Sequence, residues 1–299
     1  MFFVLGFQRI PVLSHSSPVS TDASQDFPRL LALESTDVPL QATHISVPAA
    51  ITPQLAATSS TDVVHSISTP LSLLHDQQPD IIGYSTEGRP LNVYTFGSGE
   101  RQRMIVADVH GGDEWNTLTL ANQLIKYLNQ SPDMIPDDVT LYILPNLNPD
   151  GEARTHDKYG RLNHNGVDLN RNFPVNWLAD WGRAGCWNYR PTSGGTEPGS
   201  EPETKVLMDF ISSHKIEALI SYHSAALGIF PGGDPWDENS TRLAQSIAQV
   251  STYRFPPLDT GCTYSGTLAD YAVSKGIAAV DIELINHIET DFDMNLNIL

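Results

Sequence analysis

The chain has 299 residues, of which 40% are hydrophobic and 17% charged, and its formal net charge is −18. Length and composition fit a globular protein with a substantial core, built as one large domain or two small ones. The negative charge argues against nucleic acid and anionic membranes as partners, because both would repel the chain. The apolar start MFFVLGF is too short to span a bilayer, so no membrane span is expected.

Residues 1–74 are predicted to form an N-terminal extension or linker of low order. From about residue 14 this segment is rich in Ser, Thr, Pro and Ala, and no steady period of 2 or 3.6 runs through it. Such a composition buries too little apolar surface to form a core of its own. The folded domain is therefore expected to occupy residues 75–299.

From residue 75 the pattern changes to alternating strands and helices. Short runs rich in β-branched residues predict strands at 91–96, 103–109, 139–146, 216–223 and 278–284. Amphipathic spacing predicts helices at 114–129, 200–214, 239–250 and 267–275, the second opening with a capping-type Ser and Glu. The alternation predicts an α/β fold in which helices sandwich a largely buried sheet. The irregular stretch 147–198 is unusually long for a connection, which favours a functional role.

The first candidate site is the segment ADVHGGDEWNT at 107–117. His110 is expected at the carboxyl end of a strand and Glu114 at the start of the next helix, where α/β sheets assemble ligand sites. A catalytic zinc takes three His, Asp or Glu ligands and keeps one open position. The two glycines allow the tight turn that such convergence needs. Without a metal, Asp113 and Glu114 would simply favour the helix N-terminus.

Three further pieces carry candidate chemistry. Asn170 and Arg171 lie in the loop RLNHNGVDLNRNFP and offer a fork of donors that suits a carboxylate. His223 ends a predicted strand, where a lone histidine is most often only packed or solvated. Glu283 lies in the apolar strand AAVDIEL, where burying a carboxylate without a purpose would be costly. A metal-binding or catalytic role is therefore favoured for Glu283.

In this chain order the pieces resemble the zinc carboxypeptidase family typified by carboxypeptidase A. The resemblance covers about residues 80–290, from IGYSTEGRPLNVYTFGSG to VDIELIN, and the chain looks like a compact bacterial-type member. It implies a mixed sheet between helices and one zinc ion per chain. It also implies a metallopeptidase that hydrolyses the C-terminal peptide bond of peptides with a free C-terminal carboxylate.

The resemblance makes His110 and His223 the two imidazole ligands, with an acidic ligand close behind His110. The family's usual spacing is His, two residues, Glu, whereas this chain reads His-Gly-Gly-Asp-Glu. Strict spacing selects Asp113, but the following WNT selects Glu114. Glu114 is preferred, because the extra glycine can be absorbed as a bulge and the longer side chain reaches further. Asp113 would then cap the helix.

The resemblance also implies catalytic roles. Glu283 matches the general base that takes a proton from the attacking water, and Asp168 matches the carboxylate that orients the first zinc-binding histidine. Arg161 is the candidate for polarising the scissile carbonyl, with Arg154 as the alternative.

Substrate contacts follow from the same resemblance. Asn170 and Arg171 match the pair that grips the C-terminal carboxylate, and Tyr264 is the candidate for the tyrosine that closes over the substrate. Family pockets are tuned by the residue before Asp270 and by the strand position two before the base, here Ala269 and Asp281. Asp281 would meet a basic side chain or the extra amine of diaminopimelate, unless it points away from the pocket.

The two cysteines lie in loops that face the substrate in this family. A Cys186–Cys262 disulfide would imply an exported or extracellular enzyme, and two unrelated thiols are the alternative.

Two other functions stay open. The chain could be an amidase or endopeptidase of the same family that acts on cell-wall peptides. It could also be an inactive peptide-binding module whose altered His-Gly-Gly-Asp-Glu segment no longer holds zinc. The sequence indicates no oligomeric state.

Overall fold

The structure is a computed structural model that describes residues 77–180 and 192–299. The predicted N-terminal extension, residues 1–74, lies outside the described residues. No helix in the described ranges has both the length and the apolar character that crossing a bilayer requires.

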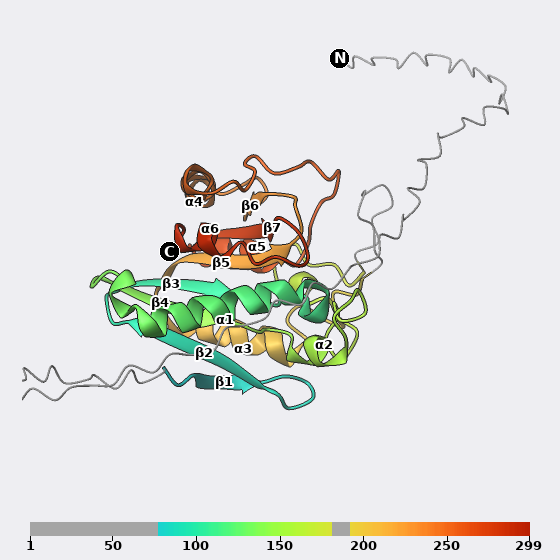
Figure 1. Cartoon of the computed structure of the whole chain (residues 1–299). Coiled ribbons are helices and arrows are strands. Elements are labelled where there is room, and N and C mark those ends of the chain that lie inside the picture. The colour runs from blue at the N-terminus through green and yellow to red at the C-terminus, as the bar shows by residue number, and fades with distance from the viewer. Residues whose placement is uncertain (1–76, 181–191) are drawn as a thin grey trace, which may run out of the picture. The chain divides into compact units, whose positions relative to one another are not determined.

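Within the described residues, seven strands form one mixed sheet in the order β1-β2-β4-β3-β5-β7-β6, which runs from the lower to the upper edge in Figure 1. The strands are β1 (Asp80–Tyr84), β2 (Pro90–Gly97), β3 (Arg101–Val106), β4 (Val139–Leu144), β5 (Ile216–Ser224), β6 (Ile229–Pro231) and β7 (Ala278–Leu284). The central strands β4, β3, β5 and β7 are parallel, and antiparallel strands lie on either side of them. This architecture confirms the predicted α/β fold.

The helices cover both faces of the sheet. They are α1 (Trp115–Gln130), α2 (Pro149–Arg154), α3 (Pro202–Ser213), α4 (Glu238–Val250), α5 (Leu268–Ser274) and α6 (Phe292–Leu296). Alternation along β3 divides the core, because Met104 and Val106 pack in the cluster that includes residues of α3 and α5, while Ile105 packs with residues of α1 and α4. The strand period of two thus builds two apolar layers on one sheet.

The predicted helix at 200–214 begins differently from its expected cap. Helix α3 starts at Pro202 with Glu201 as its N-cap residue, and no side chain caps it. Glu203, in the first turn of α3, accepts a hydrogen bond from the backbone of Thr86 at 2.8 Å. This contact ties α3 to the turn between β1 and β2.

The carboxyl ends of β3, β5 and β7 lie at one edge of the sheet, because these strands are parallel. Ala107–Val109 continue past the end of β3 as an irregular buried segment, and Asp108 has a φ of 53°. The chain therefore leaves the sheet before His110, earlier than the predicted strand end at 109. Loops from this edge form the candidate site.

Candidate metal centre and substrate pocket

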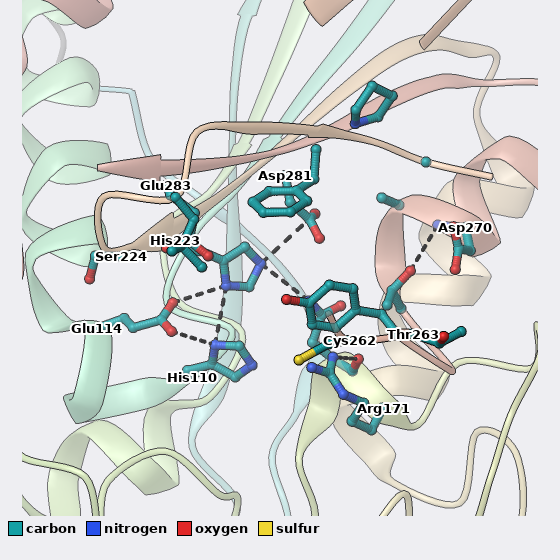
Figure 2. Close-up of a pocket in the computed structure, with 18 of the residues that line it drawn as sticks. His110, Glu114, Arg171, His223, Ser224, Cys262, Thr263, Asp270, Asp281 and Glu283 are labelled. Atoms are coloured by element: carbon teal, nitrogen blue, oxygen red, sulfur yellow. Dashed lines mark hydrogen bonds and ion pairs between the residues drawn. The ribbon is translucent and has the colours of Figure 1, made fainter. Parts of the chain in front are cut away.

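Three buried side chains converge at the carboxyl ends of the central parallel strands. His110 follows β3, Glu114 ends the short 3-10 turn Gly111–Glu114, and His223 lies in β5. One ligand atom from each lies within 4.8 Å of the others. His110 Nδ1 is 2.7 Å from Glu114 Oε1, and His223 Nδ1 is 2.9 Å from Glu114 Oε2 (Figure 2).

This donor set fits a catalytic zinc. Two imidazoles and one carboxylate form one of the common ligand sets of catalytic zinc, which leaves the fourth position for water. The two Nδ1 atoms are 3.1 Å apart, close to the separation of about 3.3 Å that tetrahedral zinc with bonds of about 2.0 Å requires. A Cβ at Gly112 would lie 1.7 Å from the Thr155 carbonyl oxygen, so only glycine allows this turn to pack there.

The alternative ligand Asp113 lies elsewhere. Its carboxylate is 3.8 Å from Arg161 Nη1, and it does not belong to the convergent group. The N-cap position of α1 is occupied by Glu114, so Asp113 does not take the capping position expected for it. The structure thus brings Glu114, and not Asp113, to the two imidazoles.

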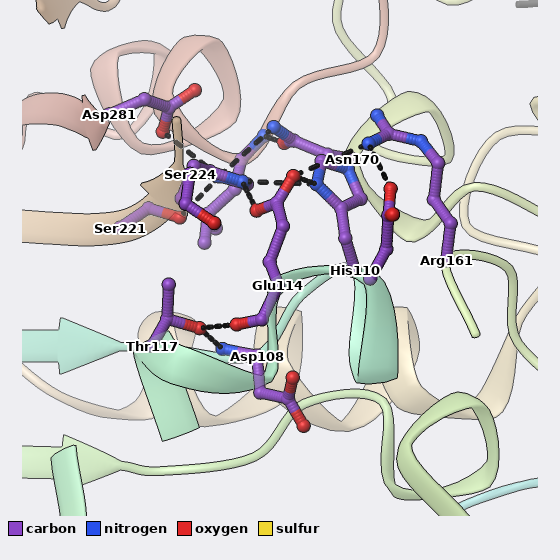
Figure 3. A network of polar contacts seen from close by, with 12 residues as sticks. Asp108, His110, Glu114, Thr117, Arg161, Asn170, Ser221, Ser224 and Asp281 are labelled. Carbon is purple, nitrogen blue, oxygen red and sulfur yellow. Dashed lines mark hydrogen bonds and ion pairs between the residues drawn. The ribbon is translucent and has the colours of Figure 1, made fainter. Parts of the chain in front are cut away.

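Asp168 lies behind the first imidazole. Its Oδ1 is 3.1 Å from His110 Nε2, and its Oδ2 accepts hydrogen bonds from Arg161 Nε and Nη2 at 3.1 and 3.0 Å. Figure 3 labels these two partners, His110 and Arg161. Burial alone would raise the pKa of Asp168, but the Arg161 guanidinium and His110 hold that pKa well below its usual range. An ionised Asp168 keeps the proton of His110 on Nε2 and leaves Nδ1 free as a ligand atom.

Arg161 and its alternative Arg154 lie in different surroundings. Arg161 lines the pocket, and its Nη1 is 3.3 Å from Glu114 Oε1. Arg154 donates to the carbonyls of Tyr159, Leu162 and Asn163 and does not line the pocket. Arg154 therefore supports the loop, whereas Arg161 faces the site.

The predicted carboxylate-binding pair lies in the 3-10 turn Leu169–Arg171, which begins where Asp168 accepts a hydrogen bond from the backbone of Asn170. Asn170 and Arg171 are both 4% exposed. Arg171 Nη1 donates to the Asn170 carbonyl at 2.6 Å, and the guanidinium lies 5.2 Å from the centre of the Tyr264 ring. The structure therefore places Tyr264 beside Arg171.

Strand β7 contributes two carboxylates on one face. Glu283 pairs with His223 across the sheet, and its Oε2 has no hydrogen-bond partner among the described residues. Burial, reinforced by the nearby Glu114 carboxylate, raises the pKa of Glu283 to about 8. Asp281 also lines the pocket, so it does not point away from it.

The three potential zinc ligands line one cavity of about 910 Å³, together with Arg161, Asn170, Arg171, Tyr264, Asp281 and Glu283. Ala269 lies in its wall, and Trp236, 47% exposed, lies at its rim. Cys262 lines the same cavity and is disulfide-bonded. Cys186, its predicted partner, lies outside the described residues. The volume is in the range of small-ligand sites.

Several neighbours of the site were not predicted. Ser221 Oγ lies 3.0 Å from His223 Nε2. Ser224 Oγ donates a hydrogen bond to Asn116 Oδ1 at 3.0 Å and also lies 3.0 Å from His287 Nδ1. Asn116 also donates to the carbonyls of residues 286 and 289. Only the position of the serines beside His223 in SYHS could have indicated these contacts.

Comparison with known proteins agrees with this geometry. The chain is 32% identical to mouse carboxypeptidase A2 over 234 residues, which cover 66% of this chain and 54% of that protein. Mouse carboxypeptidase A1 is 31% identical over 248 residues, covering 69% and 58%. The chain therefore spans little more than half the length of these relatives.

Solved structures show the same fold. The murein-tripeptide amidase MpaA from Escherichia coli O157 is 25% identical, with a TM-score of 0.54 over 73% of this chain and 88% of that one. Thrombin activatable fibrinolysis inhibitor has a TM-score of 0.61 at 22% identity, over 75% and 66%. The sequence pattern of the zinc carboxypeptidase family matches residues 71–292. The chain belongs to the zinc carboxypeptidase family.

Proposed function

We propose that this chain is a zinc-dependent metallocarboxypeptidase that hydrolyses the C-terminal peptide bond of peptides. One observation carries the proposal. The buried Arg171 guanidinium opens into the same cavity as the His110–Glu114–His223 group and Glu283. A guanidinium suits a free carboxylate, so the substrate would be anchored by its C-terminus beside the reacting groups.

Zinc held by His110, Glu114 and His223 would lower the pKa of a water molecule and polarise the scissile carbonyl. Glu283 would take a proton from the attacking water and return it to the leaving amine. Its pKa of about 8 supports both steps, because a group that titrates near neutral pH can accept and donate a proton. Arg161 would stabilise the oxyanion, and Asp168 would hold His110 in place.

Arg171 and Asn170 would bind the terminal carboxylate, with Tyr264 closing over the terminal residue. The position of Arg171 near the Tyr264 ring supports this role. Arg171 is buried, so a substrate carboxylate bound there would form charge-assisted hydrogen bonds in surroundings shielded from water.

Matched peptides with a free or an amidated C-terminus test the proposal. The purified protein should release the terminal residue from the free acid only, as followed by mass spectrometry. Arg171→Gln should raise KM for the free acid, because the carboxylate loses its cation. Equal cleavage of acid and amide, or cleavage only inside the peptide, would contradict carboxypeptidase activity.

A cell-wall peptide amidase of the same family is the second candidate, supported by the likeness to murein-tripeptide amidase. Incubation with murein tripeptide and with ordinary peptides separates the two activities. The inactive-module alternative is weakened by the convergence of the three potential ligands. Protein that binds no zinc when zinc is supplied would support it.

We also propose an exported or extracellular location, supported by the disulfide at Cys262. Titration of thiols in denaturant tests it, and two reactive thiols in freshly purified protein would contradict it.

A further inference from the structure

His287 lines the same cavity as Glu283, and the proposed peptide-bond chemistry gives it no task. It follows the end of β7 at Leu284, in a segment of exposed and half-buried residues. Its Nδ1 lies 3.0 Å from the Oγ of Ser224, the residue after the potential zinc ligand His223. The direction of the hydrogen bond between these two atoms decides which ring nitrogen of His287 can accept a hydrogen bond from a substrate.

Asn116 fixes the direction of the first hydrogen bond in this network. Its Nδ2 donates to the backbone carbonyls of Asn286 and Glu289, at 2.7 and 2.9 Å. The reverse orientation of the side chain would set its oxygen against two carbonyl oxygens, so Oδ1 must be the atom that lies 3.0 Å from Ser224 Oγ. Asn116 is fully buried in the first turn of α1, so these contacts are shielded from solvent.

The hydroxyl of Ser224 fixes the direction of the second hydrogen bond. A hydroxyl has one hydrogen, and Ser224 donates it to Asn116 Oδ1. The Ser224 oxygen can therefore only accept from His287, so Nδ1 of this imidazole carries a hydrogen. In a neutral imidazole the other nitrogen, Nε2, then accepts hydrogen bonds. No residue within the described ranges forms a hydrogen bond with this Nε2.

The segment that carries His287 is held in place on both sides. The backbone N–H of Ile285 donates to Asp291 Oδ2 at 2.9 Å. Thr290 Oγ1 donates to Gln123 Oε1 on α1 at 2.7 Å. An acceptor on a fixed backbone loses little conformational freedom when a ligand binds, which favours recognition.

The positions along β7 indicate which part of a peptide His287 would meet. Asp281 shares a hydrogen bond with Asn170, one of the two residues proposed to bind the terminal carboxylate. Glu283, the proposed base, lies two residues further along the strand, and His287 lies beyond it. With the C-terminus of a peptide at Arg171 and the scissile bond at Glu283, the chain on the amino side of that bond would extend towards His287.

We propose that His287 is a substrate-binding residue whose Nε2 accepts a hydrogen bond from a backbone N–H on the amino side of the scissile bond. This inference rests on the proposed carboxypeptidase function. A peptide carries such a donor at every residue except proline, and an N–H that loses its water on binding needs a new acceptor. Arg171 would thus hold one end of the substrate, and His287 would hold the chain on the other side of Glu283.

Depsipeptides, in which an ester oxygen replaces one backbone N–H, test this contact. The matched substrates keep the scissile amide and the free C-terminus, and lose the N–H of either the first or the second residue on the amino side. For one of the two, the amide-to-ester ratio of kcat/KM should be about 3- to 10-fold higher in zinc-loaded wild type than in His287→Ala, the factor that one hydrogen bond contributes. His287→Gln keeps an acceptor and should retain part of this ratio. A merely structural role of His287 would lower kcat/KM for amide and ester equally.

The control for these variants is His164→Ala. His164 is also exposed, and its Nδ1 also has a partner, Glu87 Oε1 at 3.0 Å, but it does not line the cavity. His164→Ala should therefore keep the wild-type amide-to-ester ratio for both substrates.

Two measurements separate this inference from the proposed function. At about pH 8, where imidazoles are neutral, NMR of protein with ¹⁵N-labelled histidine should show the hydrogen of His287 on Nδ1, with the signal assigned by its loss in His287→Gln. In Glu283→Gln protein, calorimetry should show the same amide-to-ester preference in Kd, and His287→Ala should remove it. Such binding without cleavage of any peptide by the unmodified protein would refute the peptidase proposal alone. A hydrogen on Nε2, or ratios that His287→Ala leaves unchanged for both esters, would overturn the role of His287.

Discussion

Asp168→Asn removes a negative charge that Arg161 and His110 share. The asparagine side chain has one carbonyl oxygen, which accepts hydrogen bonds, and one NH2 group, which donates them. Because the buried Arg161 needs an acceptor, the oxygen should turn to Arg161 and the NH2 group should face His110 Nε2. A donor at that position favours a proton on Nδ1, which is the atom that must stay free for zinc.

The burial of the Asp168–Arg161 pair sets the expected loss in the free energy of unfolding of Asp168→Asn. The Asp168 side chain is fully buried, and Arg161 is 16% exposed. Removing one partner of a buried pair costs about 3–5 kcal/mol. Because Glu114 stays 3.3 Å from Arg161 Nη1, the loss should lie near the lower end, at about 3 kcal/mol.

Asp150→Asn is a matched control. Asp150 is also fully buried and pairs with Arg89, but Arg89 is 40% exposed and can be resolvated. Its other contacts are with the turn after β1, through Ser85 Oγ and the backbone of Glu87. Asp150→Asn should lower the free energy of unfolding by about 1–3 kcal/mol, because it leaves hydrogen-bonding groups unsatisfied but leaves no buried charge unpaired.

Zinc separates the two variants. Losing the group that orients a ligand typically weakens metal binding by about 10- to 100-fold, which removes about 1.4–2.7 kcal/mol of zinc-induced stabilisation. Urea unfolding at a fixed, buffered free-zinc concentration measures this increment for each protein. It should be reduced in Asp168→Asn and unchanged in Asp150→Asn. An undiminished zinc increment in Asp168→Asn would refute the role of Asp168 in orienting His110.

Metal content, proton transfer and a helix cap allow three further tests. Elemental analysis should find about one zinc per chain, and chelation should lower Tm and stop peptide hydrolysis until zinc is restored; full activity of the metal-free protein would contradict the site. Glu283→Gln should keep zinc while kcat falls about 10²- to 10⁴-fold, whereas an unchanged kcat would exclude Glu283 as the base. Asp237 accepts a hydrogen bond from the backbone of Ser240 at 2.8 Å at the start of α4, and Asp237→Ala should cost about 1 kcal/mol at neutral pH. Hydrogen bonds from Ser240 lower the pKa of Asp237 in the folded protein below its ordinary value of 3.8. The difference in free energy of unfolding between wild type and variant should therefore be complete above pH 3.8 and shrink as the pH falls through the lowered pKa. A difference that does not change between pH 5 and pH 3 would contradict this cap.

Local pattern was sufficient for the elements with a long apolar face. Helix α1 buries Leu120, Leu124 and Leu128 on one stripe, and its observed bounds differ by one residue from the prediction. Strands β1 and β6 were not predicted, for different reasons. β1 is mostly exposed and contains Gly83, while β6 has only three residues and ends in proline. The order of the strands depends on non-local pairing that no local period encodes.

Residues of the candidate site could be predicted from the sequence where a single side chain is unusual in its surroundings. A carboxylate in an apolar strand stands out by chemistry alone, whereas the histidine at a strand end received its predicted role only from the family resemblance. The contact of Arg161 with Glu114 spans 47 residues, and that of Ser224 with Asn116 spans 108. Such contacts depend on how loops pack above the sheet, so spacing in the sequence could not reveal them.

Two carboxylates of the same site illustrate how packing divides the chemistry. Asp168 faces Arg161 and an imidazole, and these neighbours hold its pKa well below the usual range despite burial. Glu283 is also buried, and this burial, reinforced by the carboxylate of Glu114, raises its pKa to about 8. The first group thus stays charged and can hold a ligand in place, while the second can exchange a proton near neutral pH. The surroundings of each carboxylate, rather than the choice of Asp or Glu, therefore separate the two proposed tasks.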